Sequence, residues 1–267
     1  MEQDSTVIGL DVHKESITAA ILPPGAERVV ETLKIPNTAA ALASLVQRRA
    51  PRGPLAFVYE AGPCGYEVQR QLTALGQVCA VIAPALTPRR PGDRVKTDRR
   101  DAEKLARWYR AGELTVIRVP SCAEEAARDL VRAREDVVAD RLRARHRLGK
   151  FLLRQGRVHH LAHSRGVQYR RWLKTQRFDW PALQQTFEAY VRAVEEAQGR
   201  VEALETQLQA VAQQAPYQEP IQALRCLKGI DTLSALTLVV EVQDFRRFAT
   251  AAAFMSFTGL VPSEASS

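Results

Sequence analysis

Four carboxylates stand where acidic side chains could hold metal ions. Asp11 ends the β-branched run TVIGLD, and Glu60 ends the apolar run LAFVYE. Asp98 and Asp101 lie three residues apart in DRRDAEKLARWYR, so in a helix they share one face near the positive end of its dipole. Because ligand sites of open α/β sheets gather at the carboxyl ends of strands, we expect Asp11 and Glu60 to contribute to one such site.

The chemistry expected of these acids is that of divalent metal ions. Four converging carboxylates repel one another unless cations neutralise them, and oxygen-only ligands suit Mg²⁺ or Mn²⁺. Two such ions roughly 3.5–4 Å apart can activate a nucleophile and stabilise a leaving oxygen at a phosphodiester. Two alternatives are structural: Asp98 only caps a helix, and Glu60 only ends a strand. The phosphate-binding hairpin of actin-like ATPases is disfavoured. The turn after Asp11 is VHKE and contains no glycine, which that hairpin needs so that its backbone can approach a phosphate.

A stretch of cations without acids is the second chemical feature. Residues 141–177 contain twelve Lys and Arg and no Asp or Glu, whereas a solvated helix face normally carries both signs. This pattern predicts contact with phosphate backbones, without separating DNA from RNA, and a Pro- and cation-rich loop at 84–98 adds to it. The predicted nucleic-acid-binding residues are Arg89, Arg90, Arg94, Lys96, Arg141, Arg143, Arg145, Arg147, Lys150, Arg154, Arg157, Arg165, Arg170, Arg171 and Lys174.

Composition narrows the class of protein. A length of 267 residues with 46% hydrophobic side chains allows two globular domains, and a net charge of +8 favours a polyanionic partner. The N-terminus lacks the pattern of a secretion signal, and no apolar run reaches the roughly 20 residues of a membrane helix. The four cysteines form no C-x-x-C pair, so we expect reduced, mostly buried thiols in a cytoplasmic protein that has no membrane partner.

The elements that must position the acids alternate between strands and helices. Two β-branched runs joined by VHKE predict a hairpin, and later strands separated by helical segments predict a mixed α/β layer fold. Strands are expected at 6–11, 16–22, 27–33, 55–60, 78–83 and 114–119, with helices beginning at Asn37, 66 and Asp98.

A heptad pattern follows the basic stretch. It leaves two alternatives open: an antiparallel helical hairpin within the chain, or a dimer or tetramer interface. A capping box at Ser121 and Glu124 begins the long helix that precedes it. The seam consists of Phe187, Tyr190, Val194, Ala197, Val201, Leu204, Leu208 and Val211.

Several segments, in order, resemble one family. GLDVHK at 9–14, YEAGPCGY at 59–66 and KTDRRDAEKLAR at 96–107 resemble the RuvC-like domain of the DEDD insertion-sequence transposases, insertion-sequence family one-ten. LKGID at 227–231 and RRFATAAAFMSFTGLVPSEASS from Arg246 resemble the start of that family's second domain. The resemblance implies an α/β RNase H-like (RuvC-like) domain at 1–145, a basic helical and coiled-coil region at 146–215, and a small, mostly α domain at 216–267.

The resemblance also implies an activity. Asp11, Glu60, Asp98 and Asp101 match the family's metal-binding acids, and the nucleophilic serine after GL-x-P corresponds to Ser267, with Ser266 the near alternative. Members exchange DNA strands through a serine–DNA intermediate with Mg²⁺, guided to donor and target DNA by a structured non-coding RNA, the bridge RNA. A homo-oligomer, dimer or tetramer, would form through the coiled coil.

Two other functions remain open, and one departure from the family bears on activity. The chain could be a RuvC-like metal-dependent nuclease that uses water, or a non-catalytic, basic coiled-coil binder of nucleic acid. Family members continue past the serine, whereas this sequence stops at Ser267, so we expect a C-terminally truncated chain whose recombination is impaired.

Overall fold

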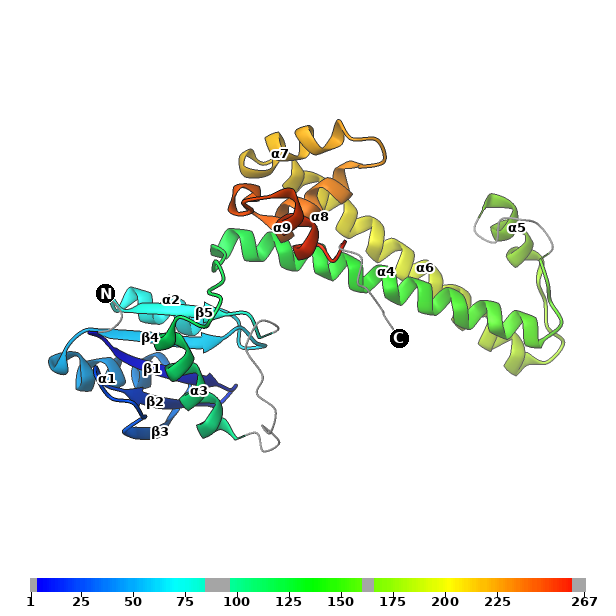
Figure 1. Ribbon diagram of the computed structural model, residues 1–267. Coiled ribbons are helices and arrows are strands. Elements are labelled where there is room, and N and C mark those ends of the chain that lie inside the picture. The colour runs from blue at the N-terminus through cyan, green and yellow to red at the C-terminus, as the bar shows by residue number, and fades with distance from the viewer. Residues whose placement is uncertain (1–3, 85–96, 160–165, 261–267) are drawn as a thin grey trace, which may run out of the picture. The chain divides into compact units, whose positions relative to one another are not determined.

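The computed structural model describes residues 4–84, 97–159 and 166–260 (Figure 1). The chain divides into two compact units, Met1–Val119 and Pro120–Ser267, and each is described by itself.

A five-stranded sheet forms the centre of the first unit, in the order β3-β2-β1-β4-β5 (Figure 1). β1 pairs antiparallel with β2, and β2 with β3, whereas β1–β4 and β4–β5 are parallel. This mixed topology agrees with the expected RNase H-like domain. The strands are β1 (Thr6–Val12), β2 (Ser16–Leu22), β3 (Glu31–Pro36), β4 (Leu55–Glu60) and β5 (Val78–Ile82).

Helices cover both faces of this sheet. α1 (Ala39–Arg49) and α2 (Glu67–Ala74) pack on one face, where Leu42 and Leu72 join a core that includes Phe57. α3 (Asp98–Ala111) packs on the other face. Burial on both faces explains why β1 and β4 are almost continuously apolar until their last residues.

Gly9 lets α3 approach the sheet closely. A Cβ at this position would lie 2.1 Å from the carbonyl oxygen of Ala102 and 2.7 Å from the amide nitrogen of Ala106. No side chain fits there, since both neighbours are helix backbone. Side chains of a strand alternate between its faces, so Asp11, two residues on, lies on the same side as α3.

Arg110 fixes the other end of α3. Its Nη1 donates to the carbonyl oxygens of Pro23 (2.6 Å) and Ala26 (3.3 Å), and its Nη2 to those of Leu22 (2.6 Å) and Ser5 (3.2 Å). These carbonyls belong to the end of β2, the loop after it and the segment before β1. One side chain therefore ties the last turn of α3 to the end of these two strands that lies opposite the acids.

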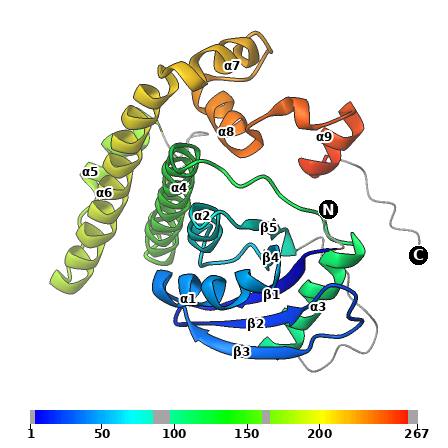
Figure 2. The same cartoon turned by 90° about the vertical axis from the view of Figure 1, so that its left-hand side faces the viewer.

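The second unit is helical in its described part (Figure 2). Its long helices are antiparallel, because the start of α4 shares a core with the end of α6, and the end of α4 shares another with the start of α6. The helices are α4 (Cys122–Arg154), α5 (Val167–Thr175), α6 (Pro181–Ala212), α7 (Ala215–Arg225), α8 (Thr232–Val242) and α9 (Ala251–Phe257).

The heptad seam packs within the chain. Phe187, Ala197, Val201 and Leu208 are buried in α6, whose main partner is α4. The intramolecular hairpin is therefore the alternative that the structure contains. The capping box at the start of α4 is confirmed: Glu124 N donates to Ser121 Oγ, and Ser121 N to the Glu124 carboxylate.

Some predicted boundaries differ from the structure. The division expected near residue 145 falls inside the unbroken helix α4, and the observed division precedes that helix. The third strand begins at Glu31, after a turn in which Ala26 N donates to Pro23 O. The segment 114–119 makes only an isolated bridge, between Ile82 and Val116.

The cysteines are free, as expected, but they are less buried than predicted: Cys122 and Cys226 are exposed, and Cys64 and Cys79 are partly buried. In the described part of the chain, every helix is too short or too polar to cross a membrane.

Candidate functional site

The register of the sheet places Asp11 and Glu60 side by side. Leu10 of β1 pairs with Tyr59 of β4 in parallel, so the next residue of each strand is a carboxylate at the same level. On the opposite side of Asp11, the antiparallel register pairs it with Thr18 of β2, which in turn pairs with Lys34 of β3. A polar row therefore crosses the sheet at the carboxyl end of β1.

The first turn of α3 supplies the other two acids. Thr97 caps the helix, its Oγ1 accepting from the backbone N–H of Arg100 at 3.3 Å, so that Asp98 and Asp101 both fall in the first turn. The close approach at Gly9 holds this helix against β1. The helix start that carries Asp98 and Asp101 thus lies beside the end of β1 that carries Asp11.

An imidazole joins Asp11 to Asp98. His13 Nε2 lies 3.1 Å from Oδ2 of Asp11 and 3.5 Å from Oδ1 of Asp98. One ligand atom from each of these three residues lies within 4.8 Å of the others. Lys34 Nζ lies 3.8 Å from the other oxygen of Asp98, Oδ2. The two oxygens of Asp98 therefore face different side chains, an imidazole and an ammonium group.

The electrostatics of Asp11 reflect this crowding. Burial raises the pKa of its carboxyl, and the charges of Asp98 and Asp101 raise it further, whereas His13 lowers it by charge and hydrogen bonding. Asp101 is thus close enough to Asp11 to repel it. Such repulsion is what a bound cation would relieve, and the carboxylate oxygens are suitable ligands for Mg²⁺ or Mn²⁺.

The four predicted acids differ in what links them to the group formed by Asp11, His13 and Asp98. Asp11 and Asp98 belong to the three-residue group, whereas Asp101 is linked to it by charge and Glu60 by strand register. Sequence reasoning missed His13 and Lys34. A signal for His13 was present, since it follows Asp11 by two residues in GLDVHK. The position of Lys34 beside the acids follows from the register of β3. The sequence predicted that this strand begins at residue 27, four residues before its actual start at Glu31.

Several predicted residues lie outside the described residues. These are Arg89, Arg90, Arg94, Lys96 and Arg165 among the cations, and both candidate nucleophiles, Ser266 and Ser267.

Most of the described cations of the basic stretch fall into two sets. In the first, Arg141 and Arg145 of α4 donate to Gln198 Oε1 of α6 at 3.0 and 3.2 Å, and Arg143 pairs with Asp140 within α4. Arg154 and Arg157 lie near the rings of Phe151 and Phe178. The second set has no acidic partner within the described part of the chain: Arg147, Lys150, Arg170, Arg171 and Lys174.

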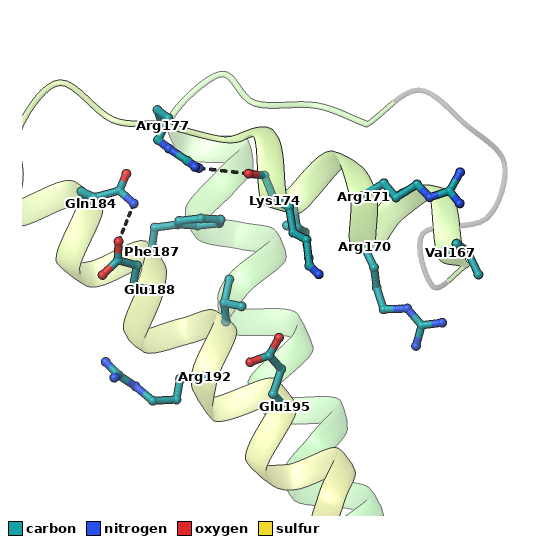
Figure 3. Close-up of a pocket in the computed structure, with 12 residues that line it drawn as sticks. Val167, Arg170, Arg171, Lys174, Arg177, Gln184, Phe187, Glu188, Arg192 and Glu195 are labelled. Atoms are coloured by element: carbon teal, nitrogen blue, oxygen red, sulfur yellow. Dashed lines mark hydrogen bonds between the residues drawn. The ribbon is translucent and has the colours of Figure 1, made fainter.

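A groove of about 810 Å³ lies between α5 and α6 (Figure 3). Its apolar lining includes Phe187, and its cations include Arg170 and Lys174 of α5, whose side chains extend into it (Figure 3). Glu188 and Glu195 line its α6 side. The cationic side suits phosphate, while the acids restrict where a polyanion can lie.

Comparisons with known proteins identify related sequences. A model of the DEDD transposase domain of IS110, described as "Transposase", matches residues 8–155. A second, described as "Transposase IS116/IS110/IS902 family", matches residues 221–267. The first match spans the four acids, and the second includes both candidate serines.

Individual relatives are also similar. A putative transposase y4qE of Sinorhizobium fredii is 42% identical over 213 residues, which cover 79% of this chain and 50% of that protein. The transposase for insertion sequence element IS1533 of Leptospira borgpetersenii is 35% identical over 246 residues, 90% of this chain and 70% of that protein. The chain thus spans about half the length of the Sinorhizobium relative.

Proposed function

The chain belongs to the IS116/IS110/IS902 family of transposases, and from this premise we propose that it cleaves and exchanges DNA strands for an insertion sequence. The observation that carries the proposal is the position of the first turn of α3. This turn places Asp98 beside the imidazole of His13, which also contacts Asp11 at the carboxyl end of the central strand β1.

Asp11, Glu60, Asp98 and Asp101 would hold two Mg²⁺ or Mn²⁺ ions. Bound there, the ions supply Lewis acidity at a phosphodiester. The protein's own part is to hold the acids in place: sheet register aligns Asp11 with Glu60, and the contact at Gly9 sets the height of α3 above them.

The proposed nucleophile is Ser267, with Ser266 the alternative. Its oxygen would bond to phosphorus while a deoxyribose oxygen leaves and takes up a proton, so that the chain becomes covalently linked to DNA. Support comes from the family match over residues 221–267. The competing proposal is hydrolysis, in which water attacks and the serines take no part.

Target choice is proposed to rest on a guide RNA that pairs with donor and target DNA. The protein would then grip phosphate backbones, with no need to read bases itself. Cations without acidic partners, such as Arg147 and Lys150, suit this role, as does the cationic side of the groove between α5 and α6.

Strand exchange needs more than one protomer, so we propose a dimer or tetramer. Because the α6 seam already packs on α4, the hairpin as a whole would be the unit that pairs. Leu142 and Leu153 of α4 are exposed large apolar residues that would contribute to such an interface.

The metal site is tested by comparing Asp11→Asn and Asp98→Asn with Asp136→Asn, an exposed acid of α4. We expect the first two variants to weaken Mg²⁺ and Mn²⁺ binding in calorimetry and to reduce metal-dependent DNA cleavage at least roughly 10³-fold. The control should change neither. Unaltered metal affinity in Asp11→Asn would instead favour the non-catalytic binder.

Covalent capture separates the two enzymatic mechanisms. Supercoiled DNA and Mg²⁺ should give a denaturation-resistant protein–DNA adduct, and the adduct should disappear in Ser267→Ala. Nicking without any adduct, equal in wild type and Ser267→Ala, would favour the hydrolytic nuclease.

The guide is tested by co-purification. The chain is expressed with the non-coding DNA that flanks its gene, and the bound nucleic acid is sequenced. One discrete RNA encoded beside the gene would support guidance, whereas a random mixture would contradict it.

A further inference from the structure

His13 adds a nitrogen donor to the site. The proposed ligands are all carboxylates, but among the described residues the group whose possible ligand atoms lie within 4.8 Å of one another contains the imidazole of His13 with Asp11 and Asp98. The His13 side chain is 53% exposed, so the group it forms with Asp11 and Asp98 lies at the surface of the protein.

The spacing of these atoms fits a shared ion. Adjacent ligands of an octahedral ion with bonds of about 2.1–2.2 Å lie about 3 Å apart, by simple geometry from typical bond lengths. The Nε2 atom of His13 lies 3.1 Å from one carboxylate oxygen and 3.5 Å from the other. The remaining pair, the carboxylate oxygens of Asp11 and Asp98, lies within 4.8 Å, so these three atoms can take neighbouring positions around one ion once the two carboxylates draw together.

The backbone at His13 is held from two sides. Its N–H donates to the carbonyl oxygen of Ser16 across the β1–β2 turn at 2.9 Å, and its carbonyl oxygen accepts from Nδ2 of Asn37 at 2.9 Å. On the opposite side of the group, Lys34 faces Oδ2 of Asp98, which leaves Oδ1 directed at the imidazole. The donor atoms are thus positioned by contacts outside the group.

Ligand chemistry then distinguishes the ions. Mg²⁺ strongly prefers oxygen ligands, whereas imidazole nitrogen suits later divalent ions, and Mn²⁺ binds nitrogen more readily than Mg²⁺ does. Resting on the metal site proposed above, we infer that His13 is a third protein ligand of the ion held by Asp11 and Asp98, and that it biases this position toward Mn²⁺ over Mg²⁺.

An alternative role for His13 is purely to orient Asp11 through a hydrogen bond. That role keeps the imidazole off the metal and affects both ions alike, because only the position of a shared carboxylate would change. The two roles therefore differ in a spectroscopic signature and in metal preference.

The experiment uses the whole chain with Mn²⁺ or Mg²⁺ alone as the probe. Pulsed electron paramagnetic resonance of bound Mn²⁺ should show coupling to a ¹⁴N nucleus, which disappears in His13→Asn. Calorimetry should show Mn²⁺ affinity falling roughly ten-fold in that variant while Mg²⁺ affinity changes less than about three-fold. His13→Asp, with an oxygen ligand, should bind Mg²⁺ at least as tightly as wild type. His146→Asn, an exposed histidine on α4, is the matched control and should match wild type throughout.

The outcomes separate this inference from the proposed metal site. If Mn²⁺ binding depends on Asp11 but shows no nitrogen coupling in wild type, or if His13→Asn weakens both ions equally, the inference fails and the metal site stands. If Asp11→Asn leaves binding of both ions intact, the proposed site itself fails.

Discussion

The acid site of the first unit and the cations of the second are built in opposite ways. Asp11, Glu60 and Asp98 come from three separate elements: strand register places Glu60 beside Asp11, and the contact at Gly9 holds the start of α3, with Asp98, against β1. The cations are near neighbours in sequence on helices α4 and α5, and most are exposed. Folding creates the first feature, whereas sequence alone is enough to concentrate the second.

This difference teaches which changes each region tolerates. The acid site should respond sharply to residues that touch no metal, because its geometry depends on packing. The cations should act nearly independently, because each contributes through its own contact with phosphate. Substitutions in the two regions should therefore differ in the size and additivity of their effects.

Gly9→Ala should be the most disruptive change near the acids. Its Cβ would collide with the backbone of α3, so we expect a loss of about 3 kcal/mol in the free energy of unfolding and weaker metal binding. Urea denaturation and hydrogen exchange of the α3 amides measure this. Gly199→Ala in α6, where nothing lies within 4 Å of the added Cβ, should instead stabilise by about 0.5–1 kcal/mol. Equal changes in unfolding free energy for Gly9→Ala and Gly199→Ala would contradict the proposed difference between the two regions.

Arg110→Lys tests the anchor at the other end of α3. A lysine cannot bind four carbonyl oxygens in the same fork, so we expect a loss of about 2 kcal/mol in unfolding free energy. Arg107→Lys is the control, since that exposed guanidinium makes one hydrogen bond, to Glu103 O at 3.4 Å. Denaturant titration of both variants should separate them, and a similar loss in both would argue against the anchor.

Single cation variants should show additive effects. Arg147→Gln, Lys150→Gln and Arg170→Gln should each lower the slope of log affinity against log salt by about 0.9 for duplex DNA and 0.7 for single strands. Arg132→Gln, whose guanidinium is bidentate to Glu241, should leave the slope unchanged. Loss of all binding from one substitution would show a specific site in place of a distributed surface.

Asp11→Asn should stabilise the metal-free protein slightly. Burial and neighbouring acids raise the pKa of Asp11, so wild type loses stability as the pH rises above the ordinary value of 3.8 through the raised one. The variant lacks this loss, and its Tm in chelator at pH 7 should be higher by roughly a few degrees. The difference should shrink toward low pH, where both side chains are neutral. A difference that grows on acidification would contradict the assignment.

Sequence reasoning found the elements better than the contacts between them. The strands that carry Asp11 and Glu60 at their carboxyl ends, the helix beginning at Asp98 and the Ser121 capping box all carried local signals, from apolar runs to capping spacing. The position of Lys34 could not be predicted, because the preceding turn moved β3 along the chain and so changed which residue faces the acids.

The contacts that the basic stretch makes within the protein were also not predicted. Its charge pattern predicts nucleic-acid binding by Arg141 and Arg145, and it did not indicate that both guanidinium groups donate to Gln198, a neutral residue on α6. Such a pairing depends on how two distant helix segments face each other, and no charge pattern within one segment reports it.

The origin of the acids in separate elements has a consequence for how the chain matures. During synthesis, the β1–β2 hairpin can form early, but Asp98 emerges only after β3, α1, β4, α2 and β5. Long-range closures of this kind are the slow steps of folding. The proposed metal site would therefore be complete only when α3 docks against Gly9, which makes docking of that helix the step that assembles its acids.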